Sequence, residues 1–327
     1  MTSAAIAATW LAGYVADIPT PFDDHGAVDL ATLAMLCERQ IDAGVTAILV
    51  AETSGEASTL TALEQEAIVR TAVDVARGRV RVVAGAGSNS TRQAIELAQR
   101  AEAAGADAAL SVVPYYNKPM QAGIQAHFEA IANSTTLPII LHDDPTRTLR
   151  ELSDDTLMQL ATSGQFIGLK DATGDLARLW RLRQLLPSSF RLLSGDDATA
   201  LPFLANGGDG CMSMVANVAP ELCQAVFSNC RSTRPRTARH LHDRLLPLSA
   251  VLAKDSPAAL KYALFLLGFM SPATRLPIVE LTADAKAEVA DAIAAIGDED
   301  IACPLERRHG PRFLAEAVTP VIGAAIR

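Results

Sequence analysis

The chain has 327 residues, of which 50% are hydrophobic and 20% charged, and its 28 basic and 37 acidic side chains give a formal net charge of −9 at pH 7. This composition excludes a disordered chain, which needs low hydrophobicity and high charge. It also argues against a nucleic-acid-binding protein, which needs a basic face.

The cysteines and apolar runs indicate the compartment. The 5 cysteines are an odd number without a Cys-x-x-Cys pair, so we expect no disulfide framework, no metal cluster and a reducing environment. Met1–Leu11 lacks the positively charged region of a signal peptide. The longest apolar run, Tyr262–Met270, is too short to span a bilayer. We therefore expect a cytoplasmic protein without a membrane partner.

Short apolar runs alternate with longer amphipathic segments as far as about residue 235. The runs predict eight strands, bounded by turn residues, at Val15–Pro19, Ala47–Val50, Val80–Ala84, Ala108–Val113, Pro138–His142, Phe166–Lys170, Arg191–Ser194 and Gly210–Met214. Helical periodicity follows in segments such as Leu30–Ala43 and Thr91–Ala104, the second with Thr91 as its expected cap. Strands separated by helices predict a parallel sheet.

Eight parallel strands favour an α/β fold closed as a (β/α)8 TIM barrel. The alternative is a doubly wound open sheet, which usually carries a Gly-x-Gly-x-x-Gly turn after its first strand. Here that strand ends in Pro19-Thr20-Pro21-Phe22, which favours the barrel.

The strand pattern stops after the barrel. We expect helices at Thr237–Leu252, Pro257–Leu267 and Ala283–Ile296, a loop at Asp298–Pro311 and a short helix at Phe313–Ile326. The predicted organisation is a barrel with a short N-terminal tail over residues 1–235, a helical region over 236–298, and a polar loop with a terminal helix over 299–327.

Active sites of such barrels lie at the carboxyl ends of the strands, and Lys170 ends the apolar run Phe166–Leu169. A desolvated lysine there is expected to have a lowered pKa, which leaves more of the neutral amine that forms a Schiff base with a carbonyl compound. The alternative is a rim lysine paired with Asp143 or Asp171.

Three further strand ends carry polar residues. Thr53-Ser54-Gly55, just before a probable helix, offers hydroxyl and N–H groups for a small anion, or is an ordinary helix cap with Glu56 as its carboxyl partner. Tyr115-Tyr116 could relay protons, or could only pack at the rim. His142 could act in acid–base catalysis, or could be a core histidine. Its neighbour Asp143 points to the opposite face of the strand, so a shared metal is not expected.

These residues carry a family resemblance. The chain resembles the dihydrodipicolinate synthase and N-acetylneuraminate lyase superfamily of pyruvate-dependent Schiff-base enzymes, and within it the synthase branch. The matching motifs, in chain order, are Pro19-Thr20-Pro21-Phe22, Thr53-Ser54-Gly55-Glu56, Pro114-Tyr115-Tyr116-Asn117, Pro145-Thr146-Arg147-Thr148, Ile167 to Gly174, Leu193 to Ala198, and Arg275-Leu276-Pro277.

The resemblance implies a role for each site residue. Lys170 would form the imine with pyruvate or a related 2-keto acid. Thr53, Ser54 and Gly55 would hold its carboxylate, helped by the backbone of Met212. Tyr116 would reach into a neighbouring subunit and relay protons through Thr53, and Arg147 would bind the carboxylate of an incoming aldehyde. The resemblance also implies a homotetramer built as a dimer of dimers, and chemistry without a metal or organic cofactor.

The chain departs from the family pattern at several positions. His142 stands where the family has its proton-relaying tyrosine, and Asp143-Asp144 replace an asparagine and an apolar residue. Glu52 stands where a glycine usually precedes Thr53. Positions expected in a lysine-inhibition site read Ala62, Gln65 and Gln93, so no inhibition by lysine is expected.

The resemblance thus implies a Schiff-base lyase or synthase. The first candidate is 4-hydroxy-tetrahydrodipicolinate synthesis from pyruvate and an aldehyde, which in the synthase branch would be aspartate semialdehyde. Another 2-keto acid aldolase or dehydratase of the superfamily is the second. A keto-acid-binding protein without catalytic activity is the third, because His142 could interrupt the proton relay.

Overall fold

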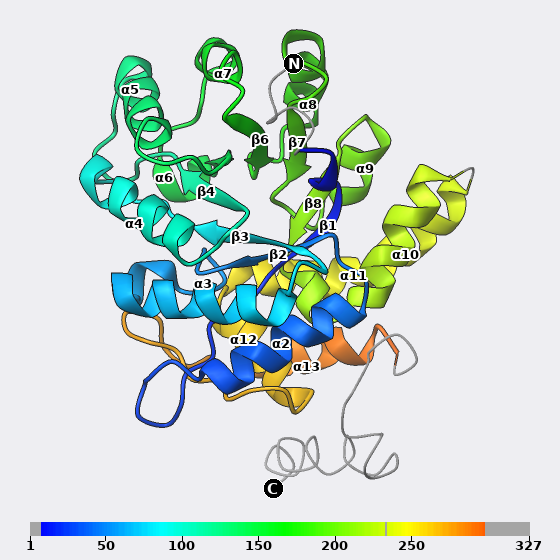
Figure 1. Ribbon diagram of the computed structural model, residues 1–327. Coiled ribbons are helices and arrows are strands. Elements are labelled where there is room, and N and C mark those ends of the chain that lie inside the picture. Colours follow the sequence, from blue (N-terminus) through cyan, green and yellow to red (C-terminus); the bar gives the residue numbers. More distant parts are fainter. Residues whose placement is uncertain (1–7, 233, 298–327) are drawn as a thin grey trace, which may run out of the picture.

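The computed structural model describes residues 8–232 and 234–297. Its eight strands are parallel, hydrogen-bond in sequence order and close into a barrel, which confirms the predicted (β/α)8 fold (Figure 1). The strands are β1 (Gly13–Asp17), β2 (Ala47–Val50), β3 (Arg81–Gly85), β4 (Ala108–Val112), β5 (Ile139–Asp143), β6 (Phe166–Asp171), β7 (Arg191–Ser194) and β8 (Gly210–Ser213). Each lies within two residues of its predicted bounds.

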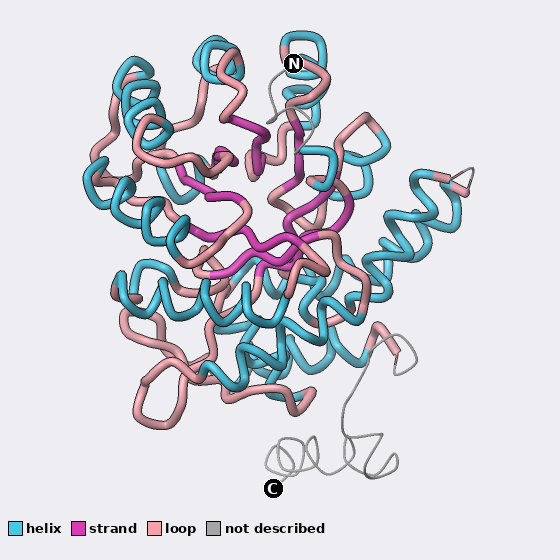
Figure 2. Tube along the Cα trace, viewed as in Figure 1, coloured by secondary structure: helices cyan, strands magenta, loops and turns pink. Residues whose placement is uncertain are grey.

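Helices surround the barrel (Figure 2). The α-helices are α2 (Leu30–Asp42), α3 (Ala62–Ala76), α4 (Thr91–Ala103), α5 (Gln121–Ala132), α6 (Pro145–Thr148), α7 (Asp154–Ala161), α8 (Leu176–Leu185), α9 (Ala200–Ala205) and α10 (Pro220–Arg231). The described residues also form three 3₁₀ turns: η1 (Ala8–Trp10), which precedes β1, η2 (Ala57–Thr59) and η3 (Val215–Asn217). The expected cap of α4 was wrong, because the Ser90 side chain caps the helix while Thr91 Oγ1 contacts Nδ1 of His127.

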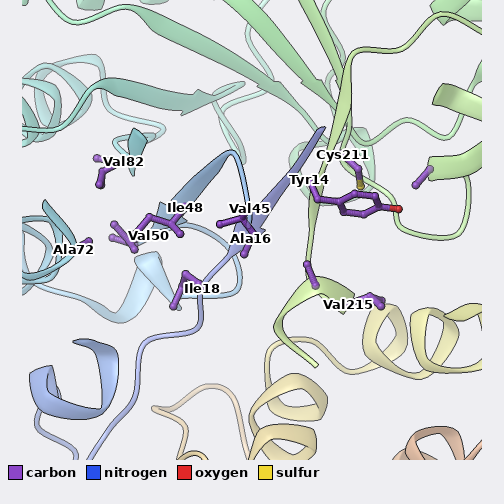
Figure 3. Close-up of a cluster of buried hydrophobic side chains, with 14 of the residues drawn as sticks. Tyr14, Ala16, Ile18, Val45, Ile48, Val50, Ala72, Val82, Cys211 and Val215 are labelled. Atoms are coloured by element: carbon purple, nitrogen blue, oxygen red, sulfur yellow. The ribbon is translucent and has the colours of Figure 1, made fainter. Parts of the chain in front are cut away.

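Two apolar clusters follow from the alternation of side chains along each strand. Tyr14, Ala16 and Ile48 point outward and pack with the surrounding helices in the larger cluster (Figure 3). Their neighbours Val15 and Leu49 belong to a separate cluster with residues of the other strands, which fills the barrel interior. Polar side chains at the carboxyl ends of the strands therefore lie next to a packed apolar layer inside the barrel.

Three helices follow the barrel as the sequence predicts: α11 (Pro235–Lys254), α12 (Ala258–Leu266) and α13 (Ala283–Ala294). Helix α11 packs against α10, and α13 packs against both α11 and α12. The division at residues 235 and 298 stays a prediction, and the predicted loop and helix beyond residue 298 lie outside the described residues. Among the described helices, none has the length and apolar character to cross a bilayer.

Candidate active site

The inner face of the barrel brings three ionisable residues to the carboxyl ends of their strands. Asp17 follows Val15 by two positions on β1, and His142 follows Ile140 by two on β5, so both point inward. Lys170 of β6 pairs in register with His142. The fold thus places these three side chains at the end of the barrel where the active site was predicted.

Lys170 is buried, with 4% of its surface exposed. Its Nζ donates to Oε2 of Glu52 at 3.0 Å and to Oδ2 of Asp17 at 3.3 Å. The alternative of a rim lysine paired with Asp143 or Asp171 was wrong. Those two carboxylates lie on the outer side of their strands, where Arg178 of α8 contacts them at 2.8 and 3.6 Å.

Glu52 connects the lysine to the histidine. Its Oε1 lies 2.9 Å from Nδ1 of His142, and its Oε2 accepts from both Lys170 Nζ and the backbone N–H of Thr53, the latter at 2.6 Å. The chain reaches this position through Ala51, whose φ of 55° lies in the left-handed region. A side chain at the facing Gly85 would place its Cβ 2.0 Å from the Ala51 carbonyl oxygen, so glycine makes this turn possible.

Burial and these contacts together set the pKa values of Lys170, Glu52 and Asp17. Burial acts to lower the pKa of Lys170, but the carboxylates of Glu52 and Asp17 outweigh it and raise that pKa above its ordinary value. Burial likewise opposes ionisation of Glu52, yet Lys170 and His142 hold its pKa well below 4.5. For Asp17 burial wins and raises the pKa to about 7. The expected lowering of the Lys170 pKa by desolvation was therefore wrong for the ligand-free protein.

The Thr53-Ser54-Gly55 turn does not begin a long helix. The 3₁₀ turn η2 follows it, and α3 begins later with Thr61 and Glu64 as a capping box. The Glu56 side chain makes no cap hydrogen bond, and its Oε1 instead lies 2.5 Å from Nζ of Lys261, a residue of α12. The helix-terminus argument for anion binding therefore fails here. The hydroxyl of Ser54 is nevertheless buried and has no hydrogen-bond partner among the described residues.

A cavity of about 550 Å³ opens beside these groups. Glu52, Thr53, Tyr115, His142 and Arg147 all line it. Lys170 is not among the lining residues, but its hydrogen-bond partner Glu52 is.

Tyr116 and Met212 do not line the cavity, whereas Arg147 lines it and contacts Asp144. Tyr116 is 86% exposed, with a φ of 68°, so it points away from this chain's own cavity. Met212 lies within the barrel interior, and the guanidinium of Arg147 lies 3.3 Å from Asp144, the cap of α6.

Asp17 was not predicted from the sequence as a site residue. The one feature that could have indicated it is its place two positions after Val15, because strand alternation puts both side chains on the inner face and Asp17 ends the strand. The described residues contain no cluster of three or more histidine, cysteine, aspartate or glutamate side chains suited to a metal.

Comparisons with known proteins agree with this geometry. The profile of the "Dihydrodipicolinate synthetase family" matches residues 11–296. A 4-hydroxy-tetrahydrodipicolinate synthase of Hyphomonas neptunium is 46% identical, over 87% of this chain and 98% of the relative. The synthase of Bartonella bacilliformis is 43% identical, over 86% of this chain and 96% of the relative.

Solved structures give the same result. The dihydrodipicolinate synthase of Acinetobacter baumannii, solved with pyruvate and described as chloride inhibited, superposes with a TM-score of 0.85 at 38% identity, over 88% of this chain and 99% of that one. The resemblance inferred from the motifs is thereby confirmed, as is the expectation of a lyase or synthase that forms a lysine Schiff base with pyruvate. The chain belongs to the dihydrodipicolinate synthetase family.

Proposed function

We propose that this protein joins pyruvate to an aldehyde through an imine on Lys170, as a 4-hydroxy-tetrahydrodipicolinate synthase or a close paralogue. The observation that carries this proposal is a single buried lysine on the inner face of the barrel, beside the turn at Thr53 and next to a cavity. No metal or organic cofactor is needed, because the protonated imine itself withdraws electrons.

The residues around the lysine support a sequence of steps. Imine formation makes the former carbonyl carbon an electron sink, so a methyl proton of pyruvate can leave and give an enamine. The enamine carbon then attacks the aldehyde, and water releases the product and the free lysine. His142, which lines the cavity, would move protons in place of the family tyrosine.

The Thr53-Ser54-Gly55 turn and the rim of the cavity supply the groups that would bind the substrates. The free hydroxyl of Ser54, with Thr53 and Gly55, would hold the keto-acid carboxylate, and the backbone of Met212 would close the other side. Arg147 at the cavity rim would bind an acidic group of the aldehyde after leaving Asp144.

We also propose a homotetramer in the cytoplasm. An exposed tyrosine with positive φ at Tyr116 is costly on a monomer and suits insertion into a second subunit. The four described cysteines are free, as in reducing compartments. Sedimentation of the wild-type protein and of Tyr116→Ala tests the assembly, since a smaller species is expected for the variant.

A second candidate is an aldolase or dehydratase that acts on another 2-keto acid. The observation that favours it is the set of Asp17, Glu52 and His142 around the lysine, because two carboxylates beside the amine disfavour a strongly acidic aldehyde. Tight pyruvate binding without turnover of any aldehyde would instead support a binding protein.

Borohydride reduction in the presence of pyruvate tests the function. We expect one adduct, which peptide mass spectrometry places on Lys170. The exposed Lys118 provides the control: Lys118→Arg should label fully and Lys170→Arg not at all. An unlabelled wild-type protein would reject the proposal. The same experiment with a panel of keto acids, followed by turnover assays with aldehydes, separates the two candidate enzymes.

A further inference from the structure

Lys170 lies between two carboxylates whose surroundings differ. Glu52 accepts hydrogen bonds from three groups: the lysine, His142 and the backbone of Thr53. Asp17 accepts from the lysine alone through Oδ2, at 3.3 Å. Its Oδ1 is buried and has no hydrogen-bond partner among the described residues, although the Ser54 hydroxyl lies near enough to lower the pKa of Asp17 somewhat.

This difference decides which carboxylate can take a proton. Each hydrogen bond to a carboxylate stabilises the ionised form, so Glu52 is a weak base and stays ionised. Asp17 is equally buried with fewer donors, and burial disfavours its charge. A base is most effective when its pKa lies near the working pH, and the Asp17 carboxyl, with a pKa raised to about 7, meets that condition.

We propose that Asp17 is the base that accepts the proton of Lys170 when the imine forms, and that Glu52, held by His142, is a positioning residue that keeps the lysine in place. This inference rests on the proposed function, since it concerns the first step of that reaction. It assigns separate roles to two acidic residues that surround one amine.

The proton balance of the step is as follows. The ammonium of Lys170 gives one proton to Oδ2 of Asp17, and the neutral amine attacks the ketone carbon, forming the C–N bond. The neutral Asp17 returns that proton to the new alkoxide. Asp17 then takes a second proton from the nitrogen and gives it to the hydroxyl group, which leaves as water while the C=N bond forms. The products are a protonated imine, water and an ionised Asp17.

Four groups with ionisable side chains act on the lysine ammonium. They are Asp17 from β1, Glu52 after β2, His142 from β5 through Glu52, and Cys211 from β8. Burial raises the pKa of the Cys211 thiol, so it remains uncharged. Asp17 is therefore the group whose ionisation we expect to govern the rate near neutral pH.

The test compares two variants that each remove one negative charge beside the same amine. The rate at which pyruvate is trapped on Lys170 is measured from pH 5 to 9 with cyanoborohydride, for the wild type, Asp17→Asn and Glu52→Gln. We expect the wild-type rate to rise with pH through about 7. Asp17→Asn should be about 100-fold slower at pH 8 and should lack this rise. Glu52→Gln should keep the rise and be slowed less than tenfold.

A purely electrostatic role for Asp17 predicts the opposite sign. Removing a negative charge lowers the pKa of Lys170 and leaves more neutral amine, so Asp17→Asn would then trap pyruvate faster than the wild type. That result overturns the proposal, as does a Glu52→Gln variant that alone loses the pH-dependent rise. Failure of the wild-type protein to trap pyruvate would instead overturn the proposed function.

Thermal melting checks that both variants fold. Should Asp17→Asn fail to fold, the wild-type protein still provides a test. Infrared spectroscopy follows the C=O stretching bands of buried protonated carboxyl groups, which include Asp143 and Asp197 besides Asp17 because burial raises the pKa of each. One band should disappear with the same midpoint at which the trapping rate rises. The absence of a band with that midpoint would contradict the assignment.

Discussion

Nδ1 of His142 lies 2.9 Å from Oε1 of Glu52, although the two residues are 90 positions apart in the chain. These are two of the positions at which the sequence departs from the family pattern. Because they contact each other, they form one unit: the carboxylate needs a donor and the histidine ring needs an acceptor. The replacement of a tyrosine and the replacement of a glycine are therefore physically linked.

This contact predicts that the two replacements cannot be reversed singly. In His142→Tyr the phenol would donate to the Glu52 carboxylate, which would divert its proton from the substrate. In Glu52→Gly the ring of His142 would lose its partner in a buried site. The double variant Glu52→Gly/His142→Tyr removes both conflicts. With pyruvate and aspartate semialdehyde, we expect its synthase activity to exceed that of either single variant by roughly tenfold, as for contacting residues that couple strongly.

The measurement is kcat/KM for all four proteins under the same conditions. Thr61→Ser provides a control at the cap of α3, near the cavity but outside the Glu52–His142 contact. It should change kcat/KM little in either background. Additive effects of Glu52→Gly and His142→Tyr would show that the two residues act independently.

The sequence was sufficient for the barrel and for the position of its lysine. Apolar runs separated by amphipathic segments are a local signal, and Lys170 ends one of these runs, so its place at the carboxyl end of β6 follows from strand alternation alone. The opposite directions of His142 and Asp143 follow in the same way, and Asp143 indeed contacts Arg178 outside the barrel.

The charge state of the lysine could not be predicted this way. Its partners Asp17 and Glu52 lie 153 and 118 positions away, and only closure of the barrel brings them together. Desolvation was inferred correctly from the apolar run, but the opposing effect of two carboxylates depends on these distant contacts. The expected helix after Thr53 failed for another reason, since the left-handed Glu56 interrupts the segment.

Gly85 on β3, which lines the cavity, is predicted to support the segment that carries Glu52. An alanine there would place Cβ 2.0 Å from the Ala51 carbonyl oxygen and 3.0 Å from Cα of Glu52, so the segment that carries Glu52 must shift. We expect Gly85→Ala to lower the pyruvate trapping rate at least tenfold and to destabilise the fold by about 1–3 kcal/mol. Gly123→Ala in α5, where Cβ meets only ordinary contact at 3.4 Å, is the matched control and should leave trapping unchanged.

Lys261 is predicted to be a structural anchor of the Thr53-Ser54-Gly55-Glu56 turn. Its buried Nζ lies 2.5 Å from Glu56 Oε1, donates to the Ala273 carbonyl at 2.9 Å and sits 3.9 Å from the ring centre of Phe22. Lys261→Met leaves the Glu56 carboxylate buried without its partner, so we expect a loss of about 3–5 kcal/mol in the free energy of unfolding.

Two further variants give the comparison for that measurement. Lys261→Met/Glu56→Gln removes both charges and should recover part of the lost stability in urea denaturation. Lys254→Met breaks the exposed pair with Glu288, whose side chains are 57% and 47% exposed, and should cost less than about 1 kcal/mol. Equal effects of Lys261→Met and Lys254→Met would contradict a buried anchor.

His127 of α5 is predicted to make the fold sensitive to acid. Burial lowers its pKa from 6.5 to about 4, so between these values the unfolded chain binds a proton that the folded protein does not. The neutral ring contributes fully to the free energy of unfolding above pH 6.5. This contribution is lost as the pH falls through 4, by up to about 3 kcal/mol.

The variant His127→Asn tests this contribution. It removes the titration, while the side-chain amide can still contact Thr91, whose Oγ1 lies 2.9 Å from Nδ1 of His127 in the wild type. Melting temperatures from pH 4 to 7 should therefore fall less steeply in this variant than in the wild type, whereas substitution of the exposed His25 by Asn should leave the slope unchanged. An equal slope in all three proteins would mean that folding does not lower the pKa of His127.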